Sequence, residues 1–184
     1  MPFFVRAASA GTEESVSSAG RGGEAEQVAL ERARVKGRAV RQELVAEGLG
    51  DCTVLSADTV VHLGTELLDK PADAAQAREF LRLLSGRKHG VVTALWVWHE
   101  GREETRWLRT WVKFAPLSES LIQAYVESEE PFDKAGGYGI QGLGGALVEG
   151  VEGCYFNVMG LPVHETGKLF SDLGIPWALD RSAG

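Results

Sequence analysis

Val54–Val61, with the sequence VLSADTVV, is the segment that decides the fold of this 184-residue chain. Its apolar and β-branched residues predict a buried strand, because such side chains pack well on a pleated surface. An ionisable residue in the middle of such a strand is unusual, since burying an unpaired carboxylate is costly. Asp58 is therefore the first candidate functional residue, with a metal, a cation or a reacting proton as its partner. The alternative interpretation is that Asp58 ends the strand and caps a turn.

The residues after this strand predict a short hairpin. Gly64 is typical of a turn, and Thr65–Leu68 has the composition of a short returning strand. Such a hairpin brings Lys70 back toward the level of Asp58, where a lysine and a carboxylate could hold a metal-bound phosphate and orient a water. The alternative for Lys70 is an ordinary surface lysine before the turn at Pro71.

Periodicity and turn residues predict the rest of the architecture. Apolar residues at helical spacing, with glycine or proline near the ends, indicate helices over residues 24–47, 74–84, 118–128 and 161–173. Residues 89–99 and 103–114 are rich in strand formers around the turn at 100–102, and Phe3–Val5 is a further short strand candidate. We therefore expect an α/β or α+β protein built on one sheet, with residues 1–184 forming a single domain.

Composition narrows the range of partners. The 19 Lys and Arg residues against 26 Asp and Glu give a net charge of −7, which argues against a nucleic-acid polymer as partner. Apolar runs such as Val91–Val97 fall well short of the roughly 20 residues needed to span a bilayer, and no secretory signal precedes them. Cys52 and Cys154 lie far apart in the sequence and have no metal-ligand spacing. We expect a cytoplasmic protein with reduced thiols, no membrane partner and a small-molecule ligand.

Two further groups of residues leave alternatives open. Residues 134–145 contain closely spaced glycines around Gln141, whose carboxamide could read a base edge. Taken alone, this segment favours a structural turn over a ligand loop. The predicted hairpin carries pairs of tryptophans on shared faces, which favour either core packing or a subunit interface, such as that of a homodimer, over stacking on a base: Trp96, Trp98, Trp107 and Trp111.

Five segments occur in this order along the sequence: Ser56–Val61, Lys70-Pro71, Leu84–His89, Asp133–Gly142 and Asn157–Pro162. This order resembles the Maf family, the septum-formation proteins that act as nucleoside triphosphate pyrophosphatases. The resemblance extends from about Pro2 to Ile175. It implies a mixed α/β fold related to the inosine triphosphatases, a mixed sheet with flanking helices and two lobes around a cleft.

The resemblance also implies a catalytic centre. It assigns Asp58 as the proton acceptor that activates the attacking water, and Lys36 and Lys70 as lysines that neutralise phosphate. Glu14 matches a glutamate close to a divalent metal, Mg²⁺ or Mn²⁺, which Asp58 would share.

The resemblance further implies which nucleotides bind. Thr59 and Gln141 match positions associated with base selection. The form AGGYGIQG, residues 135–142, is similar to the branch of the family that acts on dTTP and UTP.

One feature of the family is not found in the sequence. Family members carry a strand and a Ser-x-Ser-Pro-Arg-Arg loop before the segment that resembles Pro2–Phe4, and the sequence begins after that element. Such a loop supplies cations and N–H groups that stabilise a phosphoryl transition state, so its loss is expected to cost orders of magnitude in rate. The alternative functions are a nucleotide-binding protein of the same fold without turnover, and a structural homodimer built on the tryptophan hairpin.

Overall fold

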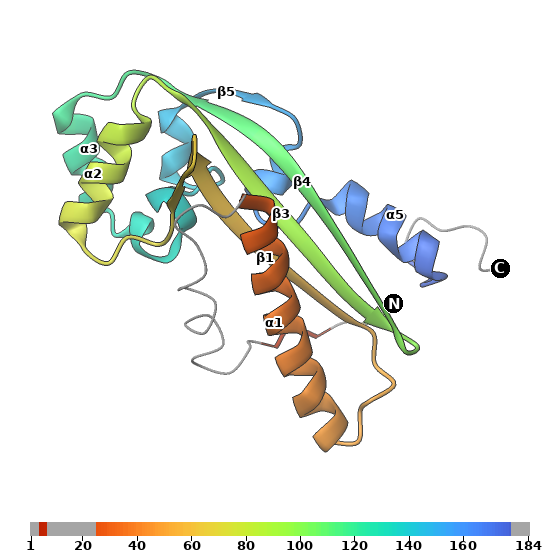
Figure 1. Cartoon of the computed structure of the whole chain (residues 1–184). Helices are drawn as coiled ribbons and strands as arrows, with labels where there is room; N and C mark the ends of the chain where they lie inside the picture. Colours follow the sequence, from red (N-terminus) through yellow and green to blue (C-terminus); the bar gives the residue numbers. More distant parts are fainter. Residues whose placement is uncertain (1–3, 7–24, 178–184) are drawn as a thin grey trace.

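A five-stranded antiparallel sheet forms the centre of the molecule (Figure 1). The computed structural model describes residues 4–6 and 25–177. The order of the strands in the sheet is β2-β1-β3-β4-β5, and every pairing between them is antiparallel. The strands are β1 (Val54–Leu63), β2 (Glu66–Leu68), β3 (Lys88–His99), β4 (Arg102–Phe114) and β5 (Val148–Glu152).

Helices cover both faces of this sheet. Figure 1 shows α1 running across the middle of the sheet, with α2 and α3 together at one end and α5 beside β4. No helix in the described ranges is both long and apolar enough to cross a membrane. The helices are α1 (Ala25–Ala46), α2 (Ala74–Leu84), α3 (Glu119–Glu127), α4 (Tyr155–Val158) and α5 (Val163–Leu173), with short 3₁₀ turns η2 (Glu130–Asp133), η3 (Ala135–Gly137) and η4 (Leu143–Leu147).

Strand β3 is the centre of the core because both of its faces are buried. Side chains alternate along a strand, so Trp96 and its even-numbered neighbours pack against α1, whereas Leu95 and Val97 pack against α5. This two-sided burial explains why the β3 sequence is almost continuously apolar. Trp96 is fully buried and Trp98 is 8% exposed, which confirms core packing for this pair, whereas Trp107 is 48% exposed.

The structure confirms most of the predicted elements. The mixed α/β class with flanking helices is confirmed, and the Glu66–Leu68 hairpin, the β3–β4 hairpin and the helix at 74–84 form as expected. The strand predicted at Phe3–Val5 is wrong in its described part, because Phe4 and Val5 belong to no strand. Both side chains are largely exposed, so no apolar burial holds this segment against the sheet.

Close packing of α1 on β3 gives a test of the core. A Cβ at Gly37 would lie 2.1 Å from Cε3 of the fully buried Trp96. We expect Gly37→Ala to lower the free energy of unfolding by about 1–3 kcal/mol through overpacking, despite the higher helix propensity of alanine. Urea unfolding measures this. Gly150→Ala is the control, because nothing lies within 4 Å of its Cβ position; equal stability of the two variants would contradict the packing.

Candidate functional site

A cavity of about 220 Å³ opens along the edge of β1. Strand β2 pairs only with Val61–Leu63, so among the described strands the part of β1 around Asp58 has β3 as its single neighbour. Residues from both faces of β1 therefore reach the same cavity. Its lining includes Lys36, Asp58, Thr59, Lys70, Asp133, Lys134 and Tyr138, and Gly160 lies in its wall.

Asp58 lies in the middle of β1 and is only 8% exposed. The ammonium Nζ of Lys36, on α1, lies 2.5 Å from Asp58 Oδ1 and donates a hydrogen bond to it. The cation offsets the cost of burying the carboxylate and stabilises its ionised form. This position confirms the buried strand aspartate with a cationic partner, and the alternative of a turn-capping residue is wrong.

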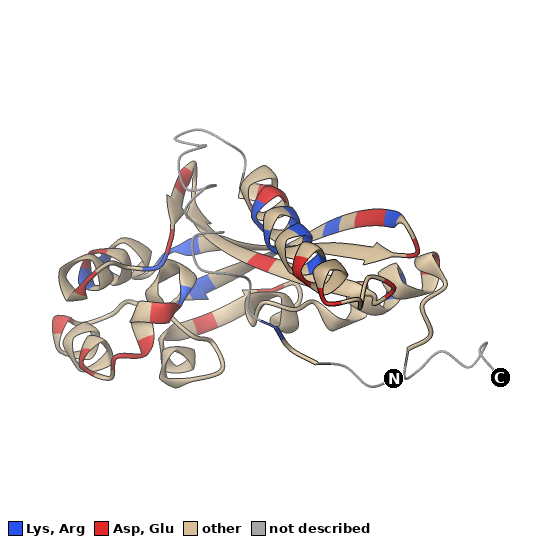
Figure 2. Ribbon diagram, turned by 90° about the horizontal axis from the view of Figure 1, so that it is seen from below, with Lys and Arg blue, Asp and Glu red and all other residues tan. Residues whose placement is uncertain are grey.

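Lys70 lines the same cavity, as the predicted hairpin requires. It lies just beyond β2 and close enough to Asp133 to lower the pKa of that carboxyl group. The larger cause of the lowered pKa is the hydrogen bond from Lys134 Nζ, 2.5 Å from Asp133 Oδ1. Together with Lys36, three ammonium groups surround one cavity. Figure 2 shows that the basic residues along α1 alternate with acidic ones, and Arg32, Arg34 and Arg38 are paired with carboxylates. The three lysines of the cavity, against two carboxylates, are what suits the site to a polyanionic ligand.

Thr59 forms another part of the wall and belongs to a polar network under it. Its hydroxyl lies 2.9 Å from that of Thr93 on β3. The Thr93 hydroxyl donates to the backbone carbonyl of Asn157, at 2.7 Å. Asn157 is fully buried on α4, and its side-chain amide holds the segment that leads to Gly160 against the sheet.

Glu130 organises the glycine-rich segment, a role that the sequence reasoning missed. One carboxylate oxygen accepts from the Tyr125 hydroxyl (2.9 Å) and the Gly144 N–H (3.0 Å), and the other accepts from the Leu143 N–H (2.8 Å). Burial alone would raise the pKa of Glu130, but these donors outweigh it and lower the pKa below its usual range. A Cβ at Gly142 would lie 2.3 Å from Glu130 Oε2, so a larger residue there would displace this carboxylate from its present position.

The structure does not bring every predicted residue together. Lys36, Asp58, Thr59 and Lys70 line one cavity, whereas Gln141 is exposed and outside this lining. The segment around Gln141 forms 3₁₀ turns, as a structural loop would, and also supplies Lys134 to the cavity.

The acidic residues of the cavity fit a hard divalent cation bound together with phosphate. Asp58 and Asp133 both line the cavity. Within residues 4–6 and 25–177, no group of three or more His, Cys, Asp and Glu side chains could hold a metal. Mg²⁺ requires no such cage, because it commonly binds through one or two carboxylates, several waters and substrate phosphates. Glu14, the predicted third ligand position, lies outside the described residues.

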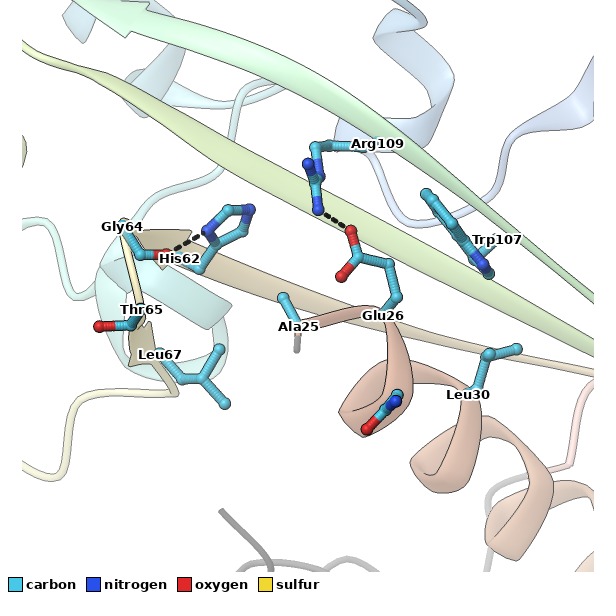
Figure 3. Close-up of a pocket in the computed structure, with 10 residues that line it drawn as sticks. Ala25, Glu26, Leu30, His62, Gly64, Thr65, Leu67, Trp107 and Arg109 are labelled. Atoms are coloured by element: carbon cyan, nitrogen blue, oxygen red, sulfur yellow. Dashed lines mark hydrogen bonds and ion pairs between the residues drawn. The ribbon is translucent and has the colours of Figure 1, made fainter. Parts of the chain in front are cut away.

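A second cavity of about 530 Å³ lies at the N-terminal end of α1 (Figure 3). Arg109 of β4 forms an ion pair with Glu26 there, and His62 Nδ1 donates to the carbonyl of Gly64 at 3.0 Å. Because the Glu26 and Arg109 charges cancel, this cavity lacks the excess of cations found beside Asp58. Of the predicted site residues that the structure describes, none lines it.

Comparison with known proteins places the chain among Maf relatives. A family model described as Maf-like protein matches residues 2–173. Over 122 residues the chain is 49% identical to a dTTP/UTP pyrophosphatase of Exiguobacterium sibiricum, covering 66% of this chain and 63% of that protein. A protein of the same name from Shewanella sp. (strain MR-7) is 48% identical. That match covers 71% of this chain and 68% of the Shewanella protein. A third protein of this name, from Thermococcus kodakarensis, is 46% identical. That match covers 77% of this chain and 73% of the Thermococcus protein.

The hydrogen bonds of Glu130 predict a pH-dependent contribution to stability. At pH 7, Glu130→Gln places an amide donor against backbone N–H donors, and we expect it to lower the free energy of unfolding by about 1–3 kcal/mol. The folded-state pKa lies below the usual 4.5, so this stabilisation is present above pH 4.5 and is lost as pH falls through the folded pKa. The difference between variant and parent should therefore shrink on acidification.

Urea titrations from pH 7 to pH 3 measure this difference. The adjacent Glu129→Gln is the matched control, because Glu129 is exposed. A Glu130→Gln variant as stable at pH 7 as the control would contradict the organising role of Glu130.

Proposed function

Because the chain belongs to the Maf family, we propose that it is a nucleoside triphosphate pyrophosphatase acting on dTTP and UTP. The products are the nucleoside monophosphate and pyrophosphate. The observation that carries the proposal is the buried ion pair of Asp58 and Lys36 in a cavity that also receives Lys70. The names of the relatives, dTTP/UTP pyrophosphatase in each case, support the same substrates. The matched segment spans 63% of the length of the Exiguobacterium protein.

Lysines provide the binding energy for the triphosphate. The ammonium groups of Lys36, Lys70 and Lys134 reach one cavity, and each is a compact charge that can follow a phosphate oxygen. Asp133 pairs with Lys134 at 2.5 Å, so an incoming phosphate competes with this carboxylate for the lysine. A divalent cation, Mg²⁺ or Mn²⁺, held near Asp58 with Glu14 would neutralise phosphate charge when bound.

Asp58 is the proposed general base. Its carboxylate accepts a proton from a water whose oxygen attacks the α-phosphorus, and the bond from that phosphorus to the bridging oxygen breaks. The pyrophosphate leaves with the electrons of that bond. Lys36 fixes the Asp58 carboxylate through its hydrogen bond to Oδ1.

Base selection is assigned to Thr59 and Gln141. Thr59 lies in the cavity wall next to Asp58 in the sequence, with its side chain on the opposite face of β1. Gln141 is exposed on the loop that supplies Lys134, and its carboxamide both donates and accepts hydrogen bonds.

Pyrophosphate release from dTTP and UTP, with Mg²⁺ or Mn²⁺, tests the proposal. We expect Asp58→Asn to lower kcat by about 10²- to 10⁴-fold, because the amide cannot accept the proton. Asp51→Asn is the matched control, because Asp51 is exposed in the turn before β1. An Asp58→Asn variant as active as Asp51→Asn would contradict the mechanism.

Metal removal and a binding measurement distinguish a metal-dependent hydrolase from a nucleotide-binding protein without turnover. Loss of turnover after chelation, with recovery on adding Mg²⁺, is the result expected for a metal-dependent hydrolase. If dTTP raises the melting temperature without pyrophosphate release, the chain is a nucleotide-binding protein of the same fold, and the hydrolase proposal fails.

A further inference from the structure

A chain of hydrogen bonds leads from the wall of the cavity into the interior of the sheet. Thr59 and Thr93 face each other across β1 and β3, with 2.9 Å between their hydroxyl oxygens. Thr93 is fully buried, and its hydroxyl lies 2.7 Å from the backbone carbonyl oxygen of Asn157. The chain therefore has three members and ends on a group that can only accept.

That last group fixes the direction of every hydrogen bond in the chain. A threonine hydroxyl has one proton to donate and two lone pairs to accept with. The Thr93 proton goes to the Asn157 carbonyl, so in the contact between the two threonines the proton comes from Thr59. With its proton directed at Thr93, the Thr59 hydroxyl has only a lone pair to offer to a ligand in the cavity.

The surroundings hold this arrangement in place. The Asn157 side-chain amide donates to the carbonyl of Val91 at 3.0 Å and to the Thr110 hydroxyl at 3.1 Å, so the accepting carbonyl cannot swing away. Beside Thr59, a Cβ at Gly160 would lie 3.3 Å from the hydroxyl oxygen. Both residues line the cavity, and glycine leaves room beside this oxygen.

We propose that Thr93 is a positioning residue that makes Thr59 an obligate hydrogen-bond acceptor, so that the cavity favours uracil and thymine over cytosine. Uracil and thymine carry an N–H at ring position 3, whereas cytosine has a lone pair there and would face the lone pair of Thr59. The proposal rests on the proposed nucleotide site and explains how that site distinguishes bases of the same shape. A buried acceptor without a donor is costly, which is why polar mismatches discriminate more strongly than size.

Binding of non-hydrolysable α,β-methylene analogues of UTP and CTP tests the proposal independently of turnover. We expect the parent chain to bind the UTP analogue at least about tenfold more tightly. Thr93→Val keeps the shape of the buried side chain but removes the acceptor, so the Thr59 hydroxyl can rotate and donate. The preference for the UTP analogue should fall about tenfold in this variant and return in Thr93→Ser.

Thr110→Val is the matched control. Thr110 is also a fully buried threonine of the sheet and also contacts Asn157, but it does not touch Thr59. Its replacement should lower the melting temperature about as much as Thr93→Val and leave the preference unchanged. Should Thr93→Val fail to fold, Thr59→Val provides the second test, since it removes the acceptor from the partly exposed wall and should abolish the preference.

Each outcome separates this inference from the proposed function. Binding with the expected preference but without pyrophosphate release from UTP leaves the inference standing and overturns the hydrolase. An equal loss of preference in Thr93→Val and Thr110→Val, or an unchanged preference in Thr93→Val or Thr59→Val, overturns the inference alone. Absence of binding by either analogue overturns both.

Discussion

The buried carboxylate of Asp58 imposes the main constraint on this structure. A charge in the interior of a sheet requires a partner of opposite charge, and Lys36 can reach it only if α1 lies close to the sheet. Gly37, the next residue, permits that approach, because any side chain there would collide with Trp96. The close packing of α1 on the sheet and the pairing of this one carboxylate thus depend on each other.

Because β2 is short, it leaves the edge of β1 around Asp58 open to a cavity. Because β2 covers only the last three residues of β1, both faces of β1 meet the same cavity one residue apart. Asp58 and Lys36 occupy the α1 face, and Thr59 occupies the face that contacts α4. A ligand that spans the edge of the strand can therefore contact groups from both faces of the sheet.

The sequence predicts those parts of the molecule that depend on local pattern. Helical periodicity and β-branched runs located the main helices and strands, and the unusual aspartate within an apolar run identified Asp58. Glu130 and Thr93 were missed, because each acts through partners far along the chain that only strand register and loop path bring near. Gln141 shows the same limit, since a motif gives its neighbours in sequence and not the direction in which the loop presents it.

The buried threonines show why such residues escape sequence patterns. Thr93 and Thr110 are β-branched, so they satisfy strand propensity as well as valine would, and nothing in the alternation of residues marks them as polar contacts. In the interior, however, each hydroxyl must have a hydrogen-bond partner. Thr93 contacts the Thr59 hydroxyl and the Asn157 carbonyl, and Thr110 accepts from the Asn157 side-chain amide. Satisfying these groups joins α4 to the sheet and sets the direction of the hydrogen bonds that reach the cavity. The hydrogen bonds of the interior and those of the cavity wall therefore form one network. A hydrophobic core of the same shape could not direct hydrogen bonds to the cavity.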